Sequence, residues 1–132
     1  MTGRGLLDTS VFIAVEVQRD LAVDRLPNES FVSVVTLAEL EAGVLAAADT
    51  ATRAVRLRTL QGAAALDPLP IDAPAASAWA RLRVTLFESG RRMGVNDLWI
   101  ASIAASRGLS VVTQDDDFDV LDELGLLDVI KL

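Results

Sequence analysis

The feature that most constrains this chain is an alternation of short, apolar, strand-like runs with longer helical patterns. Residues 5–8, 31–35 and 109–113 are short and rich in aliphatic or β-branched side chains, which is typical of buried strands. Each run is followed by a turn or a helical pattern, and a last short strand is expected at 128–131. Strands that alternate with helices predict an α/β fold with a parallel sheet covered on both faces.

Candidate capping residues stand before several of the expected helices. Thr9 or Ser10 is in this position for the first helix, Asp72 for a long helix, and Asn96 for a nearly all-apolar one. A helix that is apolar on most faces is expected to be buried. The first expected helix begins near Val11. Further helices are expected at 36–48, 52–65, 73–89 and 98–106, with a short one inside 115–124. An extended piece is expected at 69–71.

Length and hydropathy predict one compact domain over residues 1–132. The chain is 52% hydrophobic, which is enough for one core. Its 132 residues are too few for two ordinary domains. Its longest apolar stretches, such as 98–105, are shorter than the roughly 20 residues of a membrane-spanning helix. The first residues lack the pattern of a secretory signal, so we expect a cytoplasmic protein without a membrane segment.

The chain contains no cysteine, histidine or tyrosine, which removes most of the usual acids, bases and nucleophiles. Disulfides, thiolate metal sites and imidazole-bound zinc are excluded. If the protein is an enzyme, its chemistry must therefore use Asp or Glu, or water activated by a metal that these side chains hold.

Five acidic residues fall where the working edge of such a sheet is expected. In open α/β sheets, ligands bind beyond the carboxyl ends of the strands, where the strand order reverses. The acids come from four distant segments, each after an expected strand or at the start of a helix, and we expect them to meet at one edge. They are Asp8, Glu39, Asp97, Asp115 and Asp117.

The first three acids also have ordinary structural explanations. Asp8 can cap the helix that follows it, and Glu39 can be a solvated helix residue, as Glu41 is expected to be. Asp97 can complement the dipole of the helix that it opens. Its mainly apolar helix argues against a purely solvated position.

The aspartate-rich turn at 115–119 normally contains capping and solvated side chains. At most two of its acids therefore need a functional role. The spacing favours Asp115 and Asp117, with Asp116 pointing away.

Gathering several carboxylates in one place predicts a bound cation. Two like charges about 4 Å apart repel by roughly 4 kcal/mol at an effective dielectric near 20, and clustering raises their pKa values unless a cation neutralises them. All-oxygen ligands favour Mg²⁺, with Mn²⁺ as a substitute, and a magnesium site leaves positions for water and phosphate. The pattern therefore predicts metal-assisted chemistry on phosphate esters.

Four motifs, in order along nearly the whole chain, resemble those of the PIN domain and specifically of VapC-type toxins. Residues 6–13, Leu-Leu-Asp-Thr-Ser-Val-Phe-Ile, are similar to the family's first acidic motif. Residues 36–43, Thr-Leu-Ala-Glu-Leu-Glu-Ala-Gly, resemble its Glu-Leu-x-x-Gly motif. Residues 96–101, Asn-Asp-Leu-Trp-Ile-Ala, are similar to the third motif, and 112–118, Val-Thr-Gln-Asp-Asp-Asp-Phe, to the fourth.

The resemblance implies a PIN-like three-layer fold with a central, mainly parallel sheet of about five strands flanked by helices. It implies a Mg²⁺-dependent endoribonuclease, the toxin of a type II toxin–antitoxin system, in which metal-activated water hydrolyses RNA and leaves a 5′-phosphate and a 3′-hydroxyl. The implied partners are RNA and a cognate VapB-type antitoxin, whose basic C-terminal tail occupies the acidic groove. A homodimer or a toxin–antitoxin hetero-oligomer is expected.

The resemblance also implies residue roles. It selects Glu39 over Glu41 in the second motif, and it makes Thr9 and Thr113 accessory residues, the latter by hydrogen-bonding a carboxylate or metal-bound water. The implied catalytic residues are Asp8, Glu39, Asp97 and Asp115, and the implied metal ligands are Asp8, Asp97, Asp115 and Asp117.

The formal charge of −7 runs against nucleic-acid binding, because phosphate contacts usually come from a basic surface. Removing the five clustered acids from −7 leaves −2 for the rest of the chain. Arg91 and Arg92, shortly before Asp97, are the better candidates for RNA phosphate contacts; the alternative is that they only solubilise. Trp79 and Trp99 are expected in the core or a dimer contact. Further candidate arginines are Arg53, Arg56, Arg58, Arg81 and Arg83.

Two other functions fit parts of the pattern. A Mg²⁺-dependent phosphoryl-transfer or receiver-like domain also uses aspartates, but Ser10 stands where a haloacid-dehalogenase-like motif needs a second one. Lys131 suits a receiver, yet no acceptor aspartate stands on a central strand. A catalytically silent PIN-like binding module would keep the fold and lack cleavage. An aspartyl-phosphate mimic tests the first alternative, and RNA cleavage with and without a chelator tests the second.

Overall fold

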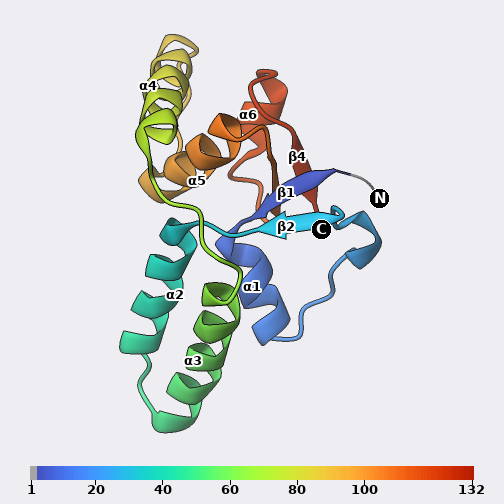
Figure 1. Cartoon of the computed structure of the whole chain (residues 1–132), viewed down its shortest axis with the longest axis vertical. Coiled ribbons are helices and arrows are strands. Elements are labelled where there is room, and N and C mark those ends of the chain that lie inside the picture. The colour runs from blue at the N-terminus through green and yellow to red at the C-terminus, as the bar shows by residue number, and fades with distance from the viewer. Residues whose placement is uncertain (1–2) are drawn as a thin grey trace.

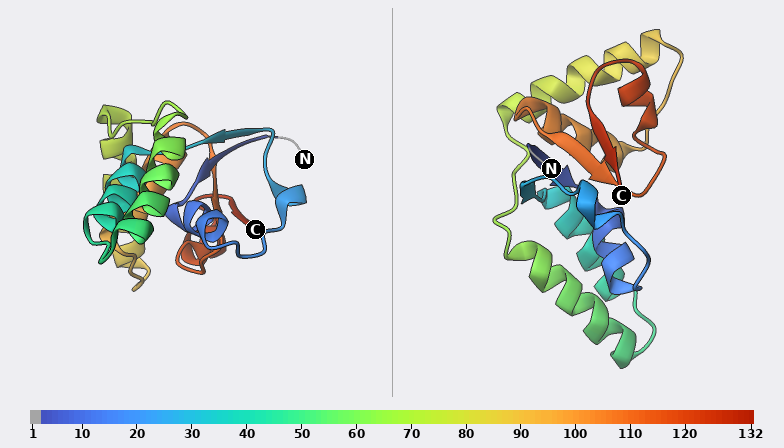
Figure 2. Two further views of the ribbon diagram at one scale, coloured as in Figure 1. Left: turned by 90° about the horizontal axis from the view of Figure 1, so that it is seen from below. Right: turned by 90° about the vertical axis from the view of Figure 1, so that its right-hand side faces the viewer.

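The computed structural model describes residues 3–132, which form a parallel sheet with helices on both faces (Figures 1 and 2). Four strands pair in the order β2-β1-β3-β4, and every pair is parallel. The predicted α/β class is confirmed, with four strands in place of about five. The piece at 69–71 makes only one bridge, between Leu69 and Ser33. The strands are β1 Arg4–Leu7, β2 Glu29–Phe31, β3 Ser110–Thr113 and β4 Val129–Lys131.

The helices form two groups at opposite ends of the molecule. In Figure 1, α2 and α3 form a hairpin that extends downward from the sheet, and α4 and α5 pack together above it. Figure 2 shows the same two groups from the side, with the sheet between them. The helices are α1 Thr9–Glu16, the 3-10 turn η1 Val23–Arg25, α2 Val34–Leu45, α3 Thr50–Ala64, α4 Ala73–Glu88, α5 Val95–Ser106 and α6 Asp119–Glu123.

Side-chain caps fix where the first helices begin. Asp8, not Thr9 or Ser10, is the N-cap of α1, and its carboxylate accepts from the backbone N–H of Ser10. Ser33 caps α2 by accepting from the N–H of Thr36. The predicted strand at 31–35 was therefore wrong in most of its length: β2 covers Glu29–Phe31 and shares only Phe31 with it, because the backbone turns into a helix after Ser33. Asp72 caps α4 as predicted.

The start of α5 also differs from the prediction. The helix begins at Val95, with Gly94 as an N-cap that has no side chain to donate or accept. Asn96 was predicted as the cap and instead lies in the first turn, where its side chain is available for another partner. Most of α5 between Leu98 and Ala104 is buried, including Ile100 and Ile103, which confirms the prediction from its apolar faces.

The sheet is packed on both faces. Alternate residues of a strand point to opposite faces, so Leu6 and Val111 pack against Ile100 of α5, while Leu7 and Val112 pack toward α1. This double burial fixes the positions of β1 and β3, the two central strands. Among residues 3–132, no helix is both long and apolar enough to cross a membrane.

Candidate functional site

The carboxyl ends of β1 and β3 lie side by side, because the two strands are parallel neighbours. Asp8 follows the last residue of β1, and its backbone N–H extends the ladder by donating to the carbonyl of Val112 at 2.8 Å. Asp115 stands two residues beyond the end of β3. Two acids that are far apart in sequence are therefore brought to one edge by strand pairing alone.

All five predicted acids line one pocket of about 330 Å³ at this edge, so the expected convergence is observed. The end of β1 and the loop after β3 supply three of them, the second turn of α2 supplies one, and the first turn of α5 supplies one. Arg19, the one cation in the lining, comes from the segment after α1. The acids are Asp8, Glu39, Asp97, Asp115 and Asp117.

Asp8 is the most deeply placed acid, with 2% of its surface exposed. Its Oδ2 accepts from the hydroxyl of Thr113 at 3.0 Å and from the N–H of Ser10 at 3.4 Å. A buried carboxylate needs such donors because water is excluded from it. Thr113 is fully buried and orients Asp8 through this bond, which is the hydrogen bond to a carboxylate that was predicted for it.

A chain of hydroxyl groups fixes this orientation. Thr113 donates its single proton to Asp8, so it must accept from Ser10, whose oxygen lies 3.1 Å away. Ser10 in turn accepts from the N–H of Gln114, and Thr113 accepts from the N–H of Asp115. The loop after β3 and the start of α1 are thereby locked together around Asp8.

Glu39 is held by a second hydroxyl pair. Thr9 donates to Oε1 of Glu39 at 2.6 Å, and therefore accepts from the hydroxyl of Thr36, 3.0 Å away. The side-chain amide of Asn96 donates to Oε2 at 3.5 Å. Both oxygens of Glu39 are thus tied to neighbouring elements, which distinguishes this residue from the exposed Glu41.

The electrostatics of the pocket favour a cation. Burial, and after it the negative charges of four neighbouring acids, together raise the pKa of Asp97 to about 7. In order of importance these neighbours are Asp8, Asp117, Glu39 and Asp115. Partial burial and the charges of Asp8 and Asp117 also raise the pKa of the more exposed Asp115. A bound cation would reverse these shifts, since it stabilises the ionised carboxylates.

Asp116 belongs to a different cluster, as predicted from its place in the turn. Its carboxylate pairs with Lys131 at 2.6 Å, and Lys131 also pairs with Asp119 at 2.9 Å. The hydrogen bond from Lys131 lowers the pKa of Asp116. Lys131 is thus engaged at the end of β4, away from Asp8, which argues against a receiver-like site.

The donor set fits Mg²⁺ with a partly aqueous coordination shell. Within residues 3–132, no three acidic side chains are arranged as a preformed metal cage. Mg²⁺ does not need one, because it usually binds one or two carboxylates and keeps several waters and substrate oxygens. All-oxygen ligands around a deep, oriented Asp8 agree with that requirement.

Four of the candidate arginines fall into two groups. Arg91 and Arg92 line a hollow of about 550 Å³ that also includes Asp97 and Asp117, so they lie beside the acidic pocket. Arg53 and Arg56 instead donate to backbone carbonyls near the end of α2, which is a structural role.

The remaining predicted residues belong to the core. Trp79 and Trp99 stack at a centroid distance of 5.1 Å and pack against the main hydrophobic cluster, as predicted.

Sequence reasoning missed three polar residues of the site. Ser10 and Arg19 line the pocket, and Asn96 binds Glu39. Ser10 could have been recognised from its position two residues after Asp8, on the helix turn that begins at the strand end. The contact of Asn96 spans 57 residues and leaves no local signal.

Comparison with known proteins agrees with this site. The family model described as PIN domain matches residues 5–124. The chain is 56% identical to Ribonuclease VapC5 of Mycobacterium tuberculosis, over 97% of this chain and 95% of that protein. It is 40% identical to Ribonuclease VapC4 of the same organism, over 96% and 97%.

A solved structure shares the fold over nearly the full length. The crystal structure of VapBC-5, a member of the VapBC family of toxin–antitoxin systems from Mycobacterium tuberculosis, superposes with a TM-score of 0.91 at 53% identity, covering 98% of this chain and 99% of that one. The family model that matches residues 5–124, together with the acidic pocket at the carboxyl edge of the sheet, shows that the class is the PIN domain. The chain belongs to the PIN-domain family and, within it, to the VapC ribonucleases.

Proposed function

We propose that this chain is a Mg²⁺-dependent endoribonuclease and the toxin of a type II toxin–antitoxin system, which hydrolyses RNA phosphodiester bonds. The observation that carries the proposal is the convergence of five carboxylates, from four separate segments, on one pocket. An all-carboxylate site without histidine or cysteine is suited to metal-assisted hydrolysis.

In this proposal Asp8, Asp97, Asp115 and Asp117 hold the metal, either directly or through its bound waters. Oδ2 of Asp8 is occupied by Thr113 and Ser10, which leaves Oδ1 for a ligand. When bound, Mg²⁺ would activate the attacking water and stabilise charge on the scissile phosphate. Mn²⁺ would substitute because it accepts the same oxygen ligands.

Glu39 is proposed as the fourth catalytic residue, together with Asp8, Asp97 and Asp115. Thr9 and Asn96 hold its carboxylate at the rim of the pocket, where it can accept a proton from the attacking water. Fixing both oxygens keeps the carboxylate in one orientation, which is the usual requirement for proton transfer.

Arg91 and Arg92 are proposed to bind the RNA backbone on one side of the pocket. Both are exposed and line the hollow next to Asp97. Guanidinium groups bind phosphate oxygens well, and their position offsets the repulsion between RNA and the acidic pocket.

The proposed protein partner is a VapB-type antitoxin with a basic C-terminal tail that occupies the acidic pocket. Charge complementarity supports this partner, and so does the likeness to a chain of a VapBC toxin–antitoxin system. We also propose a homodimer or toxin–antitoxin hetero-oligomer, a single domain over residues 1–132, and a cytoplasmic location, where RNA and the antitoxin would both be present.

RNA cleavage by the purified protein, with Mg²⁺ and with EDTA, tests the function. We expect cleavage only with the metal, and products with a 5′-phosphate and a 3′-hydroxyl. Asp8→Asn and Asp97→Asn should each lower the rate by at least about 100-fold, the usual scale for losing a charged catalytic group. Asp122→Asn, an exposed acid on α6, is the matched control and should cleave normally.

The same assay separates the alternatives. Folded wild-type protein that binds RNA and never cleaves it would indicate a silent binding module. Labelling of Asp8 by an aspartyl-phosphate mimic would indicate a phosphoryl-transfer enzyme. Full activity in both the Asp8→Asn and Asp97→Asn variants would refute the proposed site.

A further inference from the structure

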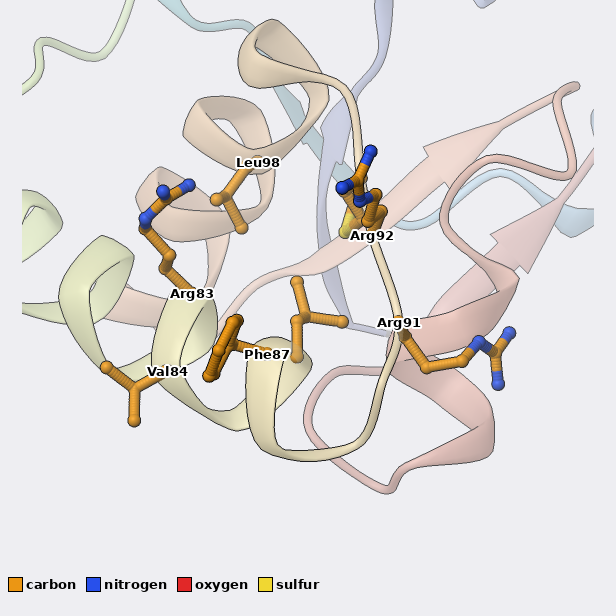
Figure 3. A pocket seen from close by; sticks show the side chains of 8 residues that line it. Arg83, Val84, Phe87, Arg91, Arg92 and Leu98 are labelled. Carbon is orange, nitrogen blue, oxygen red and sulfur yellow. The ribbon is translucent and has the colours of Figure 1, made fainter.

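A second pocket lies beside the acidic site and differs from it in chemistry. It has a volume of about 470 Å³ and is formed by the C-terminal half of α4, the segment 91–93 and the start of α5. In Figure 3, the side chains of Phe87 and Leu98 line the pocket between Arg83 on one side and Arg92 on the other. We refer to it as the α4–α5 pocket.

This pocket is continuous with the acidic site. Arg91 and Arg92 line both the α4–α5 pocket and the neighbouring hollow. That hollow shares Asp97 and Asp117 with the acidic pocket. A strand of nucleic acid with one phosphate at the acids could therefore continue past the arginines into the α4–α5 pocket.

Phe87 is an unusual residue for a surface helix. It is 83% exposed, more than any other large hydrophobic side chain described, and its neighbour Val84 is 55% exposed. The buried face of α4 is made by other residues, such as Leu82 and Leu86, so Phe87 contributes little to the core. An exposed aromatic ring next to a rim of arginines is a typical contact for an unpaired base.

The arginines around the pocket are not equivalent. Arg91 pairs with Glu123 at 3.1 Å and points away from the pocket in Figure 3. Arg83 lies over the ring of Trp79, 5.4 Å from its centroid. Among residues 3–132, Arg92 forms no ion pair or hydrogen bond with another side chain, and it stands between the two pockets.

We propose that the α4–α5 pocket receives an unpaired nucleobase of the RNA strand whose phosphodiester bond lies in the acidic pocket. The base stacks on Phe87, and Arg92 binds a phosphate between the two sites. The proposal rests on the proposed ribonuclease function and specifies its substrate as RNA with unpaired bases beside the cut. A base held in a duplex could not reach the ring.

Equilibrium binding of a short single-stranded RNA tests the pocket. The measurement uses fluorescence anisotropy in the Asp8→Asn background, so that the RNA stays intact. We expect Phe87→Ala to weaken binding by about tenfold, the scale of one base–aromatic stack, and Phe87→Trp to retain it. Leu45→Ala is the control, because Leu45 is 74% exposed and ends α2, in the opposite helix group. It should leave the affinity unchanged.

Photocrosslinking identifies the contact directly. RNA that carries 5-bromouridine should crosslink to the peptide 84–91, which contains Phe87, and the same duplexed RNA should not. Crosslinks confined to other peptides, with unchanged affinity of Phe87→Ala, would overturn the proposal. A dimer that dissociates on Phe87→Ala while RNA affinity is unchanged would also overturn it, since the surface would then bind a second copy of the chain.

The pocket and the nuclease function can fail separately. If the wild type cleaves RNA and the Phe87→Ala variant cleaves it at the same rate and at the same sites, the base pocket is refuted and the nuclease function is not. Phe87-dependent RNA binding by a wild-type protein that never cleaves RNA would refute the nuclease function alone. Because Phe87 is so exposed, its substitution should not unfold the protein, and thermal unfolding confirms this.

Discussion

Asp8 shows that a structural and a functional explanation of one residue need not exclude each other. It caps α1 and also lines the acidic pocket. Both roles follow from its position at the end of β1, because a side chain there lies next to the start of the following helix and at the carboxyl edge of the sheet. Its donors, Thr113 and Ser10, keep the carboxylate oriented without neutralising it by an ion pair.

Asp97 should make the stability of the metal-free protein depend on pH. Burial and the neighbouring negative charges raise its folded-state pKa from 3.8 to about 7, so between these values the folded state binds more protons than the unfolded state. The free energy of unfolding must then fall as pH rises through this window. Below this pH window Asp97 is protonated in both the folded and the unfolded state. Above it Asp97 is ionised in both states, and the free energy of unfolding has reached its lower value.

Urea unfolding in EDTA between about pH 5 and pH 8 measures this effect. Asp97→Asn cannot ionise, and its stability should decline less than that of the wild type. Asp122→Asn, on the exposed part of α6, should decline as the wild type does. Parallel curves for wild type and Asp97→Asn would show that Asp97 is not responsible.

At the scale of elements, the positions of helix starts matter most for the site. α2 begins after Ser33, which places Glu39 within reach of Thr9. α5 begins one residue before Asn96, which frees its amide for Glu39. A shift of either start by one residue would rotate these side chains by about 100° around the helix axis.

β1 requires glycine at position 5. A Cβ atom there would lie 2.6 Å from Cγ2 of Val112 and 2.8 Å from Cγ of Pro27, too close for either neighbour. We expect Gly5→Ala to lower the free energy of unfolding by about 1–3 kcal/mol, as overpacking does.

Gly62→Ala is the matched control in urea unfolding. Position 62 lies inside α3 with open space around the added Cβ, so alanine should stabilise the helix by about 0.5–1 kcal/mol. Equal effects of the two substitutions would contradict the packing of β1 against β3.

At the scale of the whole molecule, charge is separated by the fold. Acids from four segments gather at the carboxyl edge, and Arg91 and Arg92 lie next to them. Much of the formal charge of −7 is therefore concentrated in one acidic pocket and not spread evenly over the surface. A net negative charge is for this reason no strong argument against RNA as a substrate.

Mg²⁺ should stabilise the folded protein, because the unfolded chain does not assemble the carboxylates. At about 100 times the dissociation constant, a ligand adds about 2.7 kcal/mol, which corresponds to a Tm increase of roughly 5–10 °C for a domain of this size. Differential scanning fluorimetry measures the increase, with NaCl at equal ionic strength as control. Asp8→Asn should lose most of it, and a full increase in that variant would contradict metal binding at the pocket.

The sequence by itself determined the order of strands and helices, the buried α5 and the acids at the strand ends. These features follow from local sequence periodicity and from the general rule that the carboxyl ends of parallel strands lie at one edge of the sheet. The resemblance of four motifs then distinguished Glu39 from Glu41 and Asp115 from Asp116.

Only the tertiary structure decided the start of α2, the partners of Ser10 and Asn96, the separate roles of Arg91 and Arg92, and the raised pKa of Asp97. Each depends on groups far away in the sequence, as when Thr113 donates to Asp8 across 105 residues. Hydropathy and capping preferences act within a few residues. Hydrogen bonds and charge repulsion between distant segments exist only once the sheet has brought those segments together.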